Sequence, residues 1–417
     1  MSRMTTISGC RSCGDPGLVQ LLEFGAMPLA NALVPAEDLG RPDARYPLTL
    51  VFCPRCALVQ IKETVDPDVL FGTYLYFSSF SDTMLAHARE EASHLAARRG
   101  LSASSLVVEI ASNDGYLLKN FVAMGIPVLG IEPAANVART ATAGGVRTEI
   151  AFFGSELAKR LRGDGLRADV VIANNVLAHV ADLNGIAAGI ATLLTDDGLA
   201  AIEFPYVGDM IEAVEFDTIY HEHLCYFSLH AASAVFARHG LAVTDVERHA
   251  IHGGSLRIYL ERAGRKAGDA VARLLDEESR RGMDAARFYE DFAARVTKLR
   301  DELMRELRRR KAAGQRLAAY GASAKGSTLM NAFGIGADLL DFVADRSTVK
   351  QGRYTPGNHL PIVAPEALME KRPDAVLLLT WNFAEEIFRQ QAAYLSAGGT
   401  FVLPIPEVRA VGKEVLA

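Results

Sequence analysis

The 417-residue chain lacks several features that would assign it to a common functional class. Its longest apolar runs, such as residues 375–379, are only strand-length, so no membrane partner is expected. Lys and Arg number 44 against 50 Asp and Glu. Because basic residues are not in excess, nucleic acid is not expected as a partner either. Residues 1–9 lack the apolar core of a signal peptide, which predicts a cytoplasmic location.

Cysteine is scarce, but its placement is informative. Four of the five cysteines form two C-x-x-C pairs, and reducing conditions would leave these thiols free to bind metal. Two such pairs complete a set of four thiolates, which suits zinc, and a site filled by four protein ligands is structural and not catalytic. The alternatives are free core thiols or a redox dithiol, although a redox dithiol needs no second pair. The predicted ligands are Cys10, Cys13, Cys53 and Cys56.

A dinucleotide fingerprint is also missing. Residues 106–110 predict a buried strand, residues 116–124 a helix, and residues 128–132 a second strand that ends in Glu132. The loop between the first strand and the helix has one glycine, Gly115, where the fingerprint requires three. Asn113 and Asp114 would crowd and repel a pyrophosphate. S-adenosylmethionine, which has a ribose but no phosphate, fits better. An ordinary βαβ unit without ligand is the alternative.

The ligand would use the carboxyl ends of these strands, where open α/β sheets bind nucleosides. Glu132 would accept hydrogen bonds from the ribose, and Glu109 and Asp114 would face the cationic end of the cofactor. A further strand at residues 169–173 ends in polar residues. The position of His179 shortly after this strand favours a functional role for it. The predicted cofactor-binding residues are Glu109, Ser112, Asn113, Asp114, Gly115, Glu132, Asn174 and Asn175.

The four consecutive residues Tyr220-His221-Glu222-His223 are the densest polar cluster in the chain. Imidazoles beside a carboxylate and a phenol can move a proton near neutral pH. The cluster is not a zinc-protease helix, because H-E-x-x-H requires a second histidine where Cys225 stands. A hydrogen-bonded surface loop is the alternative interpretation.

A second strand–loop–helix pattern follows a charged helical stretch at residues 269–313. Strands are predicted at residues 316–320 and 341–345, the second ending in Asp345, and the loop after the first contains two glycines, hydroxyls and Lys325. Such a loop suits phosphate, so we expect a nucleotide or nucleotide sugar here, with a bare βα turn as the alternative. Later strands should complete a small parallel sheet, and Trp381 ends one of them on the crevice side, or else is a core residue. The predicted substrate-binding residues are Gly321, Ala322, Ser323, Lys325, Gly326, Asp345 and Trp381.

Together these motifs resemble one family, the three-domain sugar C-methyltransferases that act on nucleotide-linked 4-keto deoxysugars. The resemblance covers essentially the whole chain. It implies structural zinc, S-adenosylmethionine as cofactor, and a nucleotide-linked keto-deoxysugar, with dTDP as its nucleotide, that is methylated at C3 through an enolate. It further implies that His223 is the base. It places Tyr220, Glu222, His179 and a tyrosine equivalent to Tyr74 or Tyr76 in the same pocket.

The predicted fold class is α/β, with a small four-cysteine zinc module, a central Rossmann-like methyltransferase domain and a C-terminal Rossmann-like domain. The predicted boundaries are residues 1–66 for the zinc module, 67–262 for the methyltransferase domain, 263–313 for a helical connector and 314–417 for the nucleotide-sugar domain. Two alternatives stay open at this point. One is a nucleotide-sugar epimerase or NAD-dependent enzyme, and the other is a non-catalytic, zinc-bearing binding module.

Overall fold

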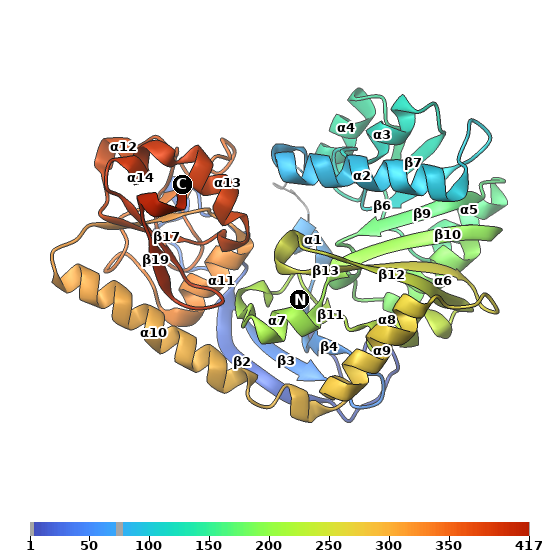
Figure 1. The fold of residues 1–417 in the computed structure, drawn as a ribbon, viewed down its shortest axis with the longest axis horizontal. Helices are drawn as coiled ribbons and strands as arrows, with labels where there is room; N and C mark the ends of the chain where they lie inside the picture. Colours follow the sequence, from blue (N-terminus) through green and yellow to red (C-terminus); the bar gives the residue numbers. More distant parts are fainter. Residues whose placement is uncertain (1–3, 72–77, 417) are drawn as a thin grey trace.

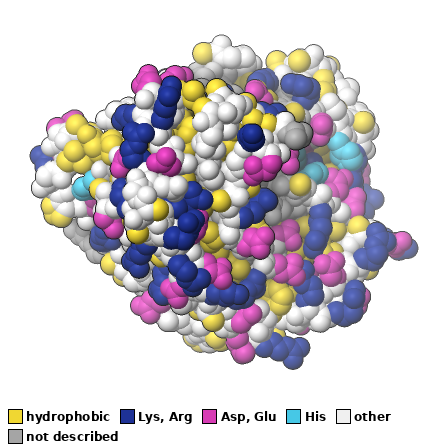
Figure 2. Space-filling model, turned by 60° about the vertical axis from the view of Figure 1, so that its left-hand side comes forward, with side chains coloured by type: hydrophobic (Ala, Val, Ile, Leu, Met, Phe, Trp, Pro, Cys, Tyr) yellow, Lys and Arg dark blue, Asp and Glu magenta, His cyan; other side chains and the backbone are white. Residues whose placement is uncertain are grey.

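The computed structural model describes residues 4–71 and 78–416. Its strands form three larger sheets and one two-stranded pair. Among the described residues, no helix is both long and apolar enough to cross a bilayer. Acidic and basic side chains are interspersed over the face shown in Figure 2.

The N-terminal sheet is antiparallel and includes a strand from the middle of the chain. Its order is β11-β4-β3-β2, and the strands are β2 (Val19–Pro28), β3 (Arg45–Phe52), β4 (Val59–Ile61) and β11 (Cys225–Tyr226). A separate pair joins β1 (Met4–Thr6) to β5 (Glu63–Val65). Because β11 follows residues 220–223 directly, the N-terminal sheet holds one end of the polar cluster.

The central sheet has seven strands in the order β12-β13-β10-β9-β6-β7-β8. Only β13 runs against its neighbours. The carboxyl ends of β6, β7, β9 and β10 therefore meet at one edge, where such sheets bind ligands. The strands are β6 (Val107–Ile110), β7 (Val128–Ile131), β8 (Thr148–Glu149), β9 (Ala168–Asn174), β10 (Leu194–Pro205), β12 (Leu241–His249) and β13 (Ser255–Arg262).

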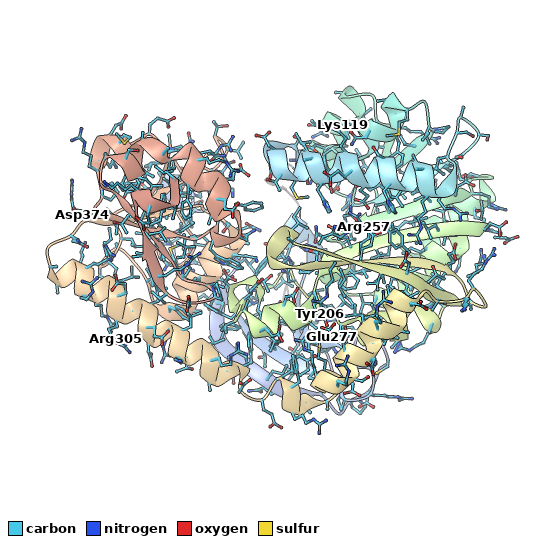
Figure 3. All side chains as sticks on the ribbon, viewed as in Figure 1. Lys119, Tyr206, Arg257, Glu277, Arg305 and Asp374 are labelled. Carbon is cyan, nitrogen blue, oxygen red and sulfur yellow. The ribbon has the colours of Figure 1, made fainter. Side chains whose placement is uncertain are left out.

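Helices lie against this sheet and include α2 (Asp82–Arg99), which begins at the Ser81 cap and ends at Gly100. Arg257 of β13 (Figure 3) lies beneath α2, where it pairs with Glu203 at 2.6 Å and Glu91 at 3.2 Å. Buried charges of this kind are tolerated only when they are paired. The other helices and 3₁₀ turns here are α1 (Pro67–Phe71), η2 (Ser78–Phe80), α3 (Leu118–Ala123), α4 (Ala135–Ala143), α5 (Ser155–Gly163), η3 (Leu177–His179), α6 (Leu183–Leu193), α7 (Val207–Glu212), η4 (Phe216–Thr218) and α8 (Leu229–Ala237).

The C-terminal sheet has six strands in the order β16-β15-β14-β17-β18-β19. Five are parallel, in agreement with the expected parallel sheet, and β19 adds an antiparallel strand at one edge. The strands are β14 (Leu317–Tyr320), β15 (Val343–Ala344), β16 (Ile362–Val363), β17 (Ala375–Leu378), β18 (Thr400–Leu403) and β19 (Arg409–Val411). The helices and turns are α11 (Ala324–Phe333), α12 (Ala367–Lys371), η7 (Trp381–Phe383), α13 (Ala384–Gln390) and α14 (Ala392–Ser396).

Two helices connect the central and C-terminal sheets, α9 (Asp269–Arg281) and α10 (Phe292–Ala312). The predicted helical stretch is thus interrupted after Gly282, which adopts a left-handed conformation and so ends α9. In Figure 1 the C-terminal sheet and the central sheet lie on opposite sides of the molecule, and β2 and β3 lie between them. The predicted α/β class, with a four-cysteine module and two Rossmann-like sheets, is confirmed. The exact domain boundaries stay a prediction.

Candidate functional site

The four predicted cysteine ligands converge on one point. Their sulfur atoms all lie within 4.8 Å of one another, with Cys10 Sγ and Cys56 Sγ 3.5 Å apart and Cys13 Sγ and Cys53 Sγ at the same separation. Tetrahedral zinc with Zn–S bonds of about 2.3 Å requires sulfur separations of about 3.8 Å. The thiols therefore fit one zinc ion with little movement, and all four positions are filled by protein.

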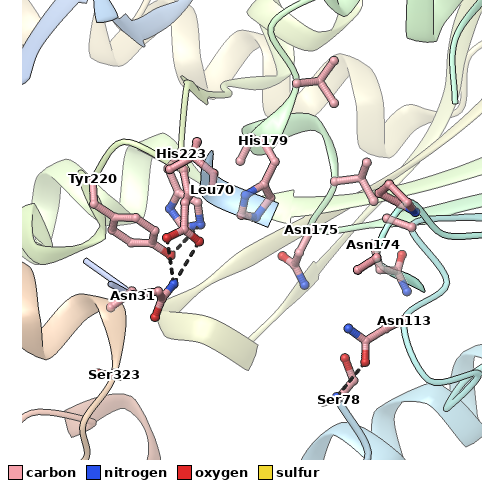
Figure 4. Close-up of a pocket in the computed structure, with 18 of the residues that line it drawn as sticks. Asn31, Leu70, Ser78, Asn113, Asn174, Asn175, His179, Tyr220, His223 and Ser323 are labelled. Atoms are coloured by element: carbon pink, nitrogen blue, oxygen red, sulfur yellow. Dashed lines mark hydrogen bonds between the residues drawn. The ribbon is translucent and has the colours of Figure 1, made fainter. Parts of the chain in front are cut away.

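A cavity of about 1110 Å³ lies between the three sheets. Figure 4 shows Tyr220, His223 and Asn31 on one side of it and Asn113, Asn174 and Ser78 on the other. Predicted residues from all three parts of the chain line this one cavity: Asn113, Glu132, Asn174, Asn175, His179, Tyr220, Glu222, His223, Ser323, Lys325 and Asp345. Tyr74 and Tyr76 lie outside the described residues.

Glu132 is held at the end of β7 by the backbone. Its two carboxylate oxygens accept hydrogen bonds from the amide groups of Ala134, at 2.8 Å, and Asn113, at 3.0 Å. Burial raises the pKa of Glu132, and the two amides oppose that shift. The carboxylate is thus fixed at the cavity wall with further lone pairs available to a hydroxyl donor.

Backbone strain concentrates at this edge of the sheet. Ala111, Asn113 and Asn175 line the cavity and have φ angles of 54°, 49° and 57°. Asparagine tolerates this left-handed region better than most residues, whereas alanine rarely adopts it, and such positions cluster at functional sites. The conformations of the loops after β6 and β9 therefore indicate a functional role beyond reversing the chain.

Four predicted cofactor residues do not line the cavity. Glu109 is buried within β6, which raises its pKa well above the usual value, and Asp114 instead accepts hydrogen bonds from Ser79. Ser112 packs under the loop against Gly130. Gly115 has a φ of 78°, and a Cβ there would lie 3.0 Å from Val146, so its role is to turn the chain tightly. These four residues therefore support the conformation of the loop after β6 and do not face the cavity.

The hydrogen bonds of His223 define its tautomer. Nδ1 lies 2.8 Å from the carbonyl oxygen of Thr218, which can only accept, so Nδ1 carries the proton. Nε2 of the neutral ring is then an acceptor, and it receives the hydroxyl of Tyr220 at 2.8 Å. The structure therefore holds a basic nitrogen and a phenol side by side at the cavity wall.

Glu222 is buried at the same wall, with an exposed fraction of 4%. Asn31 of the N-terminal module donates from Nδ2 to both of its carboxylate oxygens. Burial raises the pKa of Glu222 to about 7, and Asn31 opposes the shift. This carboxyl can therefore change protonation near neutral pH.

The other two imidazoles near the cluster have different roles. His221 points away from the cavity and its Nε2 donates to the carbonyl of Pro47 at 2.9 Å, so it ties the cluster to β3. The ring of His179 lies across that of His223, with centroids 4.7 Å apart and planes at 77°. Burial lowers the pKa of His179 to about 4, and the ring is therefore neutral at physiological pH.

The C-terminal part contributes Ser323, Lys325 and Asp345 of the predicted set. Asp345 accepts from the amides of Ala322 and Ser347, both at 2.7 Å, which fixes the loop after β14. Lys325 Nζ lies 3.6 Å from Glu215 Oε2. Gly321, Ala322 and Gly326 do not line the cavity. The two glycines instead allow close packing on the residues that follow β17, since a Cβ on Gly321 would collide with Thr380 and one on Gly326 with Leu379.

Trp381 has a different environment from the one predicted. Its neighbours Thr380 and Asn382 line the cavity, but its indole Nε1–H donates to Asp217 Oδ2 at 2.8 Å. The side chain is thus directed to η4 of the central part.

Several residues of the cavity wall carry little or no signal in the sequence. Asn31 and Phe152 carry no motif, and Phe152 is 58% exposed despite its aromatic side chain. Lys350 and Arg353 line the same cavity as Lys325 and add two cations to its wall. The only available signal for these two was their short distance in sequence from Asp345.

Comparisons with known proteins agree with this organisation. Family models match in succession: a zinc binding domain at residues 10–71, a methyltransferase domain at residues 84–246 and a C-methyltransferase C-terminal domain at residues 250–406. The four cysteines lie within the first of these domains, so zinc as the predicted structural cofactor is confirmed. That these four residues are its ligands stays a prediction.

Solved structures of methyltransferases resemble part of the chain. The glycopeptide N-methyltransferase MtfA, complexed with S-adenosylmethionine, has a TM-score of 0.35 and 14% identity, covering 42% of this chain and 94% of its own. The magnesium protoporphyrin IX methyltransferase ChlM of Synechocystis has a TM-score of 0.33 and 14% identity, covering 44% and 82%.

One relative matches from end to end. The C-methyltransferase NovU of Streptomyces niveus is 37% identical over 410 residues, which cover 98% of each chain. Zinc cluster, cavity and polar cluster thus occur within a chain that aligns with it throughout. This protein belongs to the NovU family of C-methyltransferases.

Proposed function

We propose that this enzyme transfers a methyl group from S-adenosylmethionine to C3 of a nucleotide-linked 4-keto deoxysugar, through an enolate. The observation that supports the proposal most is that a single cavity is lined by three different groups of residues, each forming one wall. Glu132 and the strained loops form one, His223 and Tyr220 the second, and the cations of the C-terminal part the third.

The cofactor would occupy the edge of the central sheet. Glu132 would accept hydrogen bonds from its ribose hydroxyls, in the manner of acids that end the second strand of nucleoside-binding folds. Phe152 and Phe153 lie at the same wall and offer flat apolar faces to a base. When bound, S-adenosylmethionine supplies an electrophilic methyl group.

The sugar nucleotide would span the remaining space. Lys325, Lys350 and Arg353 line the C-terminal side and would neutralise a diphosphate. The substrate carbonyl would then lie toward the polar cluster. The relative NovU is by name a C-methyltransferase, and methylation at a carbon beside a carbonyl requires the kind of base that the cluster contains.

The residues of the cluster divide the proton transfer between them. His223 would accept the C3 proton at Nε2, its unprotonated nitrogen. The hydroxyl of Tyr220, which donates to that nitrogen at 2.8 Å in this structure, would turn to the C4 oxygen when substrate binds. This movement would release the Nε2 lone pair for the C3 proton and would stabilise the negative charge that develops on the oxygen. His179, whose pKa is lowered to about 4 by burial, would act only as a neutral hydrogen-bonding group. Glu222, whose pKa is raised to about 7 by burial, would hold or release a proton of its own at the same wall, apart from the C3 proton on His223.

The decisive experiment follows deuterium at C3. dTDP-linked 4-keto-6-deoxysugars in D₂O with S-adenosylhomocysteine should exchange C3–H, as observed by NMR. His223→Ala should slow exchange about 10²- to 10⁴-fold. As control, His239→Ala removes an imidazole whose partner is Asn184 outside the cavity, and it should exchange at the wild-type rate. Wild-type exchange in His223→Ala would exclude His223 as the base.

A further inference from the structure

The short turn η4 lies at the junction of all three parts of the chain. Phe216 stacks on Phe333 of α11, with ring centroids 4.6 Å apart, and on Phe24 of β2 at 6.3 Å. The next residue, Asp217, is completely buried. The position of η4 therefore depends on contacts from both the N-terminal and the C-terminal parts.

Besides the ion pair of Lys325 with Glu215, a polar contact at this junction comes from the chain's single tryptophan. Trp381 Nε1 donates to Asp217 Oδ2 at 2.8 Å. Lys325 Nζ lies 4.7 Å from the centroid of the same indole ring, which is a favourable cation–π distance. A buried carboxylate without a donor is costly, so the indole N–H stabilises the position of Asp217.

Thr218 follows Asp217 directly and connects this contact to the base. Its carbonyl oxygen accepts the Nδ1–H of His223 at 2.8 Å. A neutral imidazole has two tautomers, and only the Nδ1–H form has a lone pair on Nε2, which accepts the hydroxyl of Tyr220 in this structure and could accept a proton when that hydroxyl turns to a ligand. If the carbonyl of Thr218 moved, the ring could instead donate Nε2–H to Tyr220.

We propose that Trp381 is a positioning residue: through Asp217 it fixes η4 so that Thr218 holds His223 in the tautomer with its lone pair on Nε2. The C-terminal part would thus complete the base as well as bind substrate. Because Thr380 and Asn382 line the cavity on either side of Trp381, a ligand there would contact the same turn. The inference rests on the proposed role of His223 as base.

The test observes the tautomer directly and needs neither cofactor nor sugar. Protein with ¹⁵N-labelled histidine is examined by long-range ¹H–¹⁵N NMR at pH 8, and the His223 signals are identified by their loss in His223→Gln. Wild-type protein should show one protonated and one unprotonated ring nitrogen. Trp381→Phe keeps an aromatic ring but removes the N–H, and its two nitrogen shifts should move toward each other as the tautomers mix.

The matched control is Tyr394→Phe. This variant removes another buried donor of the C-terminal part. The hydroxyl of Tyr394 donates to the carbonyl oxygen of Pro373 at 2.9 Å. This contact does not involve η4, so the His223 signals should stay unchanged. Asp217→Asn keeps an oxygen for the indole and should retain the wild-type tautomer, whereas Asp217→Ala should mix it. These two variants provide the test if Trp381→Phe does not fold.

Unshifted His223 signals in Trp381→Phe and Asp217→Ala, or an equal shift in Tyr394→Phe, would overturn the proposal. A failure of C3 exchange in the preceding experiment would leave these spectra unaffected, so the two proposals fail separately. If both hold, Trp381→Phe should lower kcat for methyl transfer about tenfold, with the KM for S-adenosylmethionine unchanged.

Discussion

Asn31 Nδ2 lies 2.8 and 2.9 Å from the two carboxylate oxygens of Glu222, which stands 191 positions later in the chain. An amide from the zinc-bearing module therefore satisfies a buried acid of the central part. The pairing β11 to β4 brings these segments together. The N-terminal module is thus part of the cavity wall and not a separate appendage.

The first prediction concerns stability against pH. Burial raises the pKa of Glu222 from 4.5 to about 7, so the folded state binds a proton more tightly than the unfolded state. Its contribution to stability is present below pH 4.5 and is lost as pH rises to 7. Glu222→Gln should match wild type at pH 4.5 and exceed it by roughly 3 kcal/mol at pH 8. Chemical denaturation at the two pH values measures this, with exposed Glu37→Gln as control. An equal difference at both pH values would contradict it.

The second prediction concerns the side-chain amide of Asn31 and its hydrogen bonds to Glu222. Asn31→Ala removes two hydrogen bonds to the charged form of Glu222, and the pKa of that carboxyl should rise further. The variant should lose about 1–3 kcal/mol of stability at pH 8 and less at pH 5. Asn120→Ala loses two bonds to the backbone carbonyls of Tyr116 and Leu117, just before α3, and its loss of stability should not depend on pH. Chemical denaturation of both variants at the two pH values distinguishes them.

The third prediction concerns the cofactor. Glu132→Ala should raise the Kd for S-adenosylhomocysteine about 10- to 100-fold, because hydrogen bonds to a charged group contribute about 1.5–3 kcal/mol. Glu149→Ala changes an acid on the neighbouring strand that pairs with Arg160, and it should bind normally. Calorimetry measures both. Equal Kd values for the two variants would remove Glu132 from the ribose site.

The fourth prediction concerns zinc. Purified protein should contain one zinc per chain, and Cys53→Ser should lose it and unfold at lower temperature, because structural zinc stabilises the fold that binds it. Methyl transfer should fall as well, since β4 carries β11 and the adjoining cluster. Cys225→Ala removes a buried thiol outside the metal cluster and should keep its zinc. Elemental analysis with thermal denaturation checks the set, and retained zinc in Cys53→Ser would refute the site.

Local sequence was sufficient for features whose physics is local. The spacing of Cys10, Cys13, Cys53 and Cys56 determined a zinc site, because two C-x-x-C turns present thiolates in the required geometry. Strands ending in polar residues placed Glu132 and Asn174 at one edge, because parallel strands share their carboxyl ends. The α/β class followed from the same alternation of strands and helices.

Tertiary structure alone decided which neighbours face the cavity. His221 and His223 are two residues apart, but one bonds to Pro47 of the N-terminal module and the other to Tyr220 at the cavity wall. Asn31, and the turn of Trp381 toward Asp217, are likewise contacts between distant segments. No periodicity encodes such contacts, because they depend on how the three sheets pack against one another.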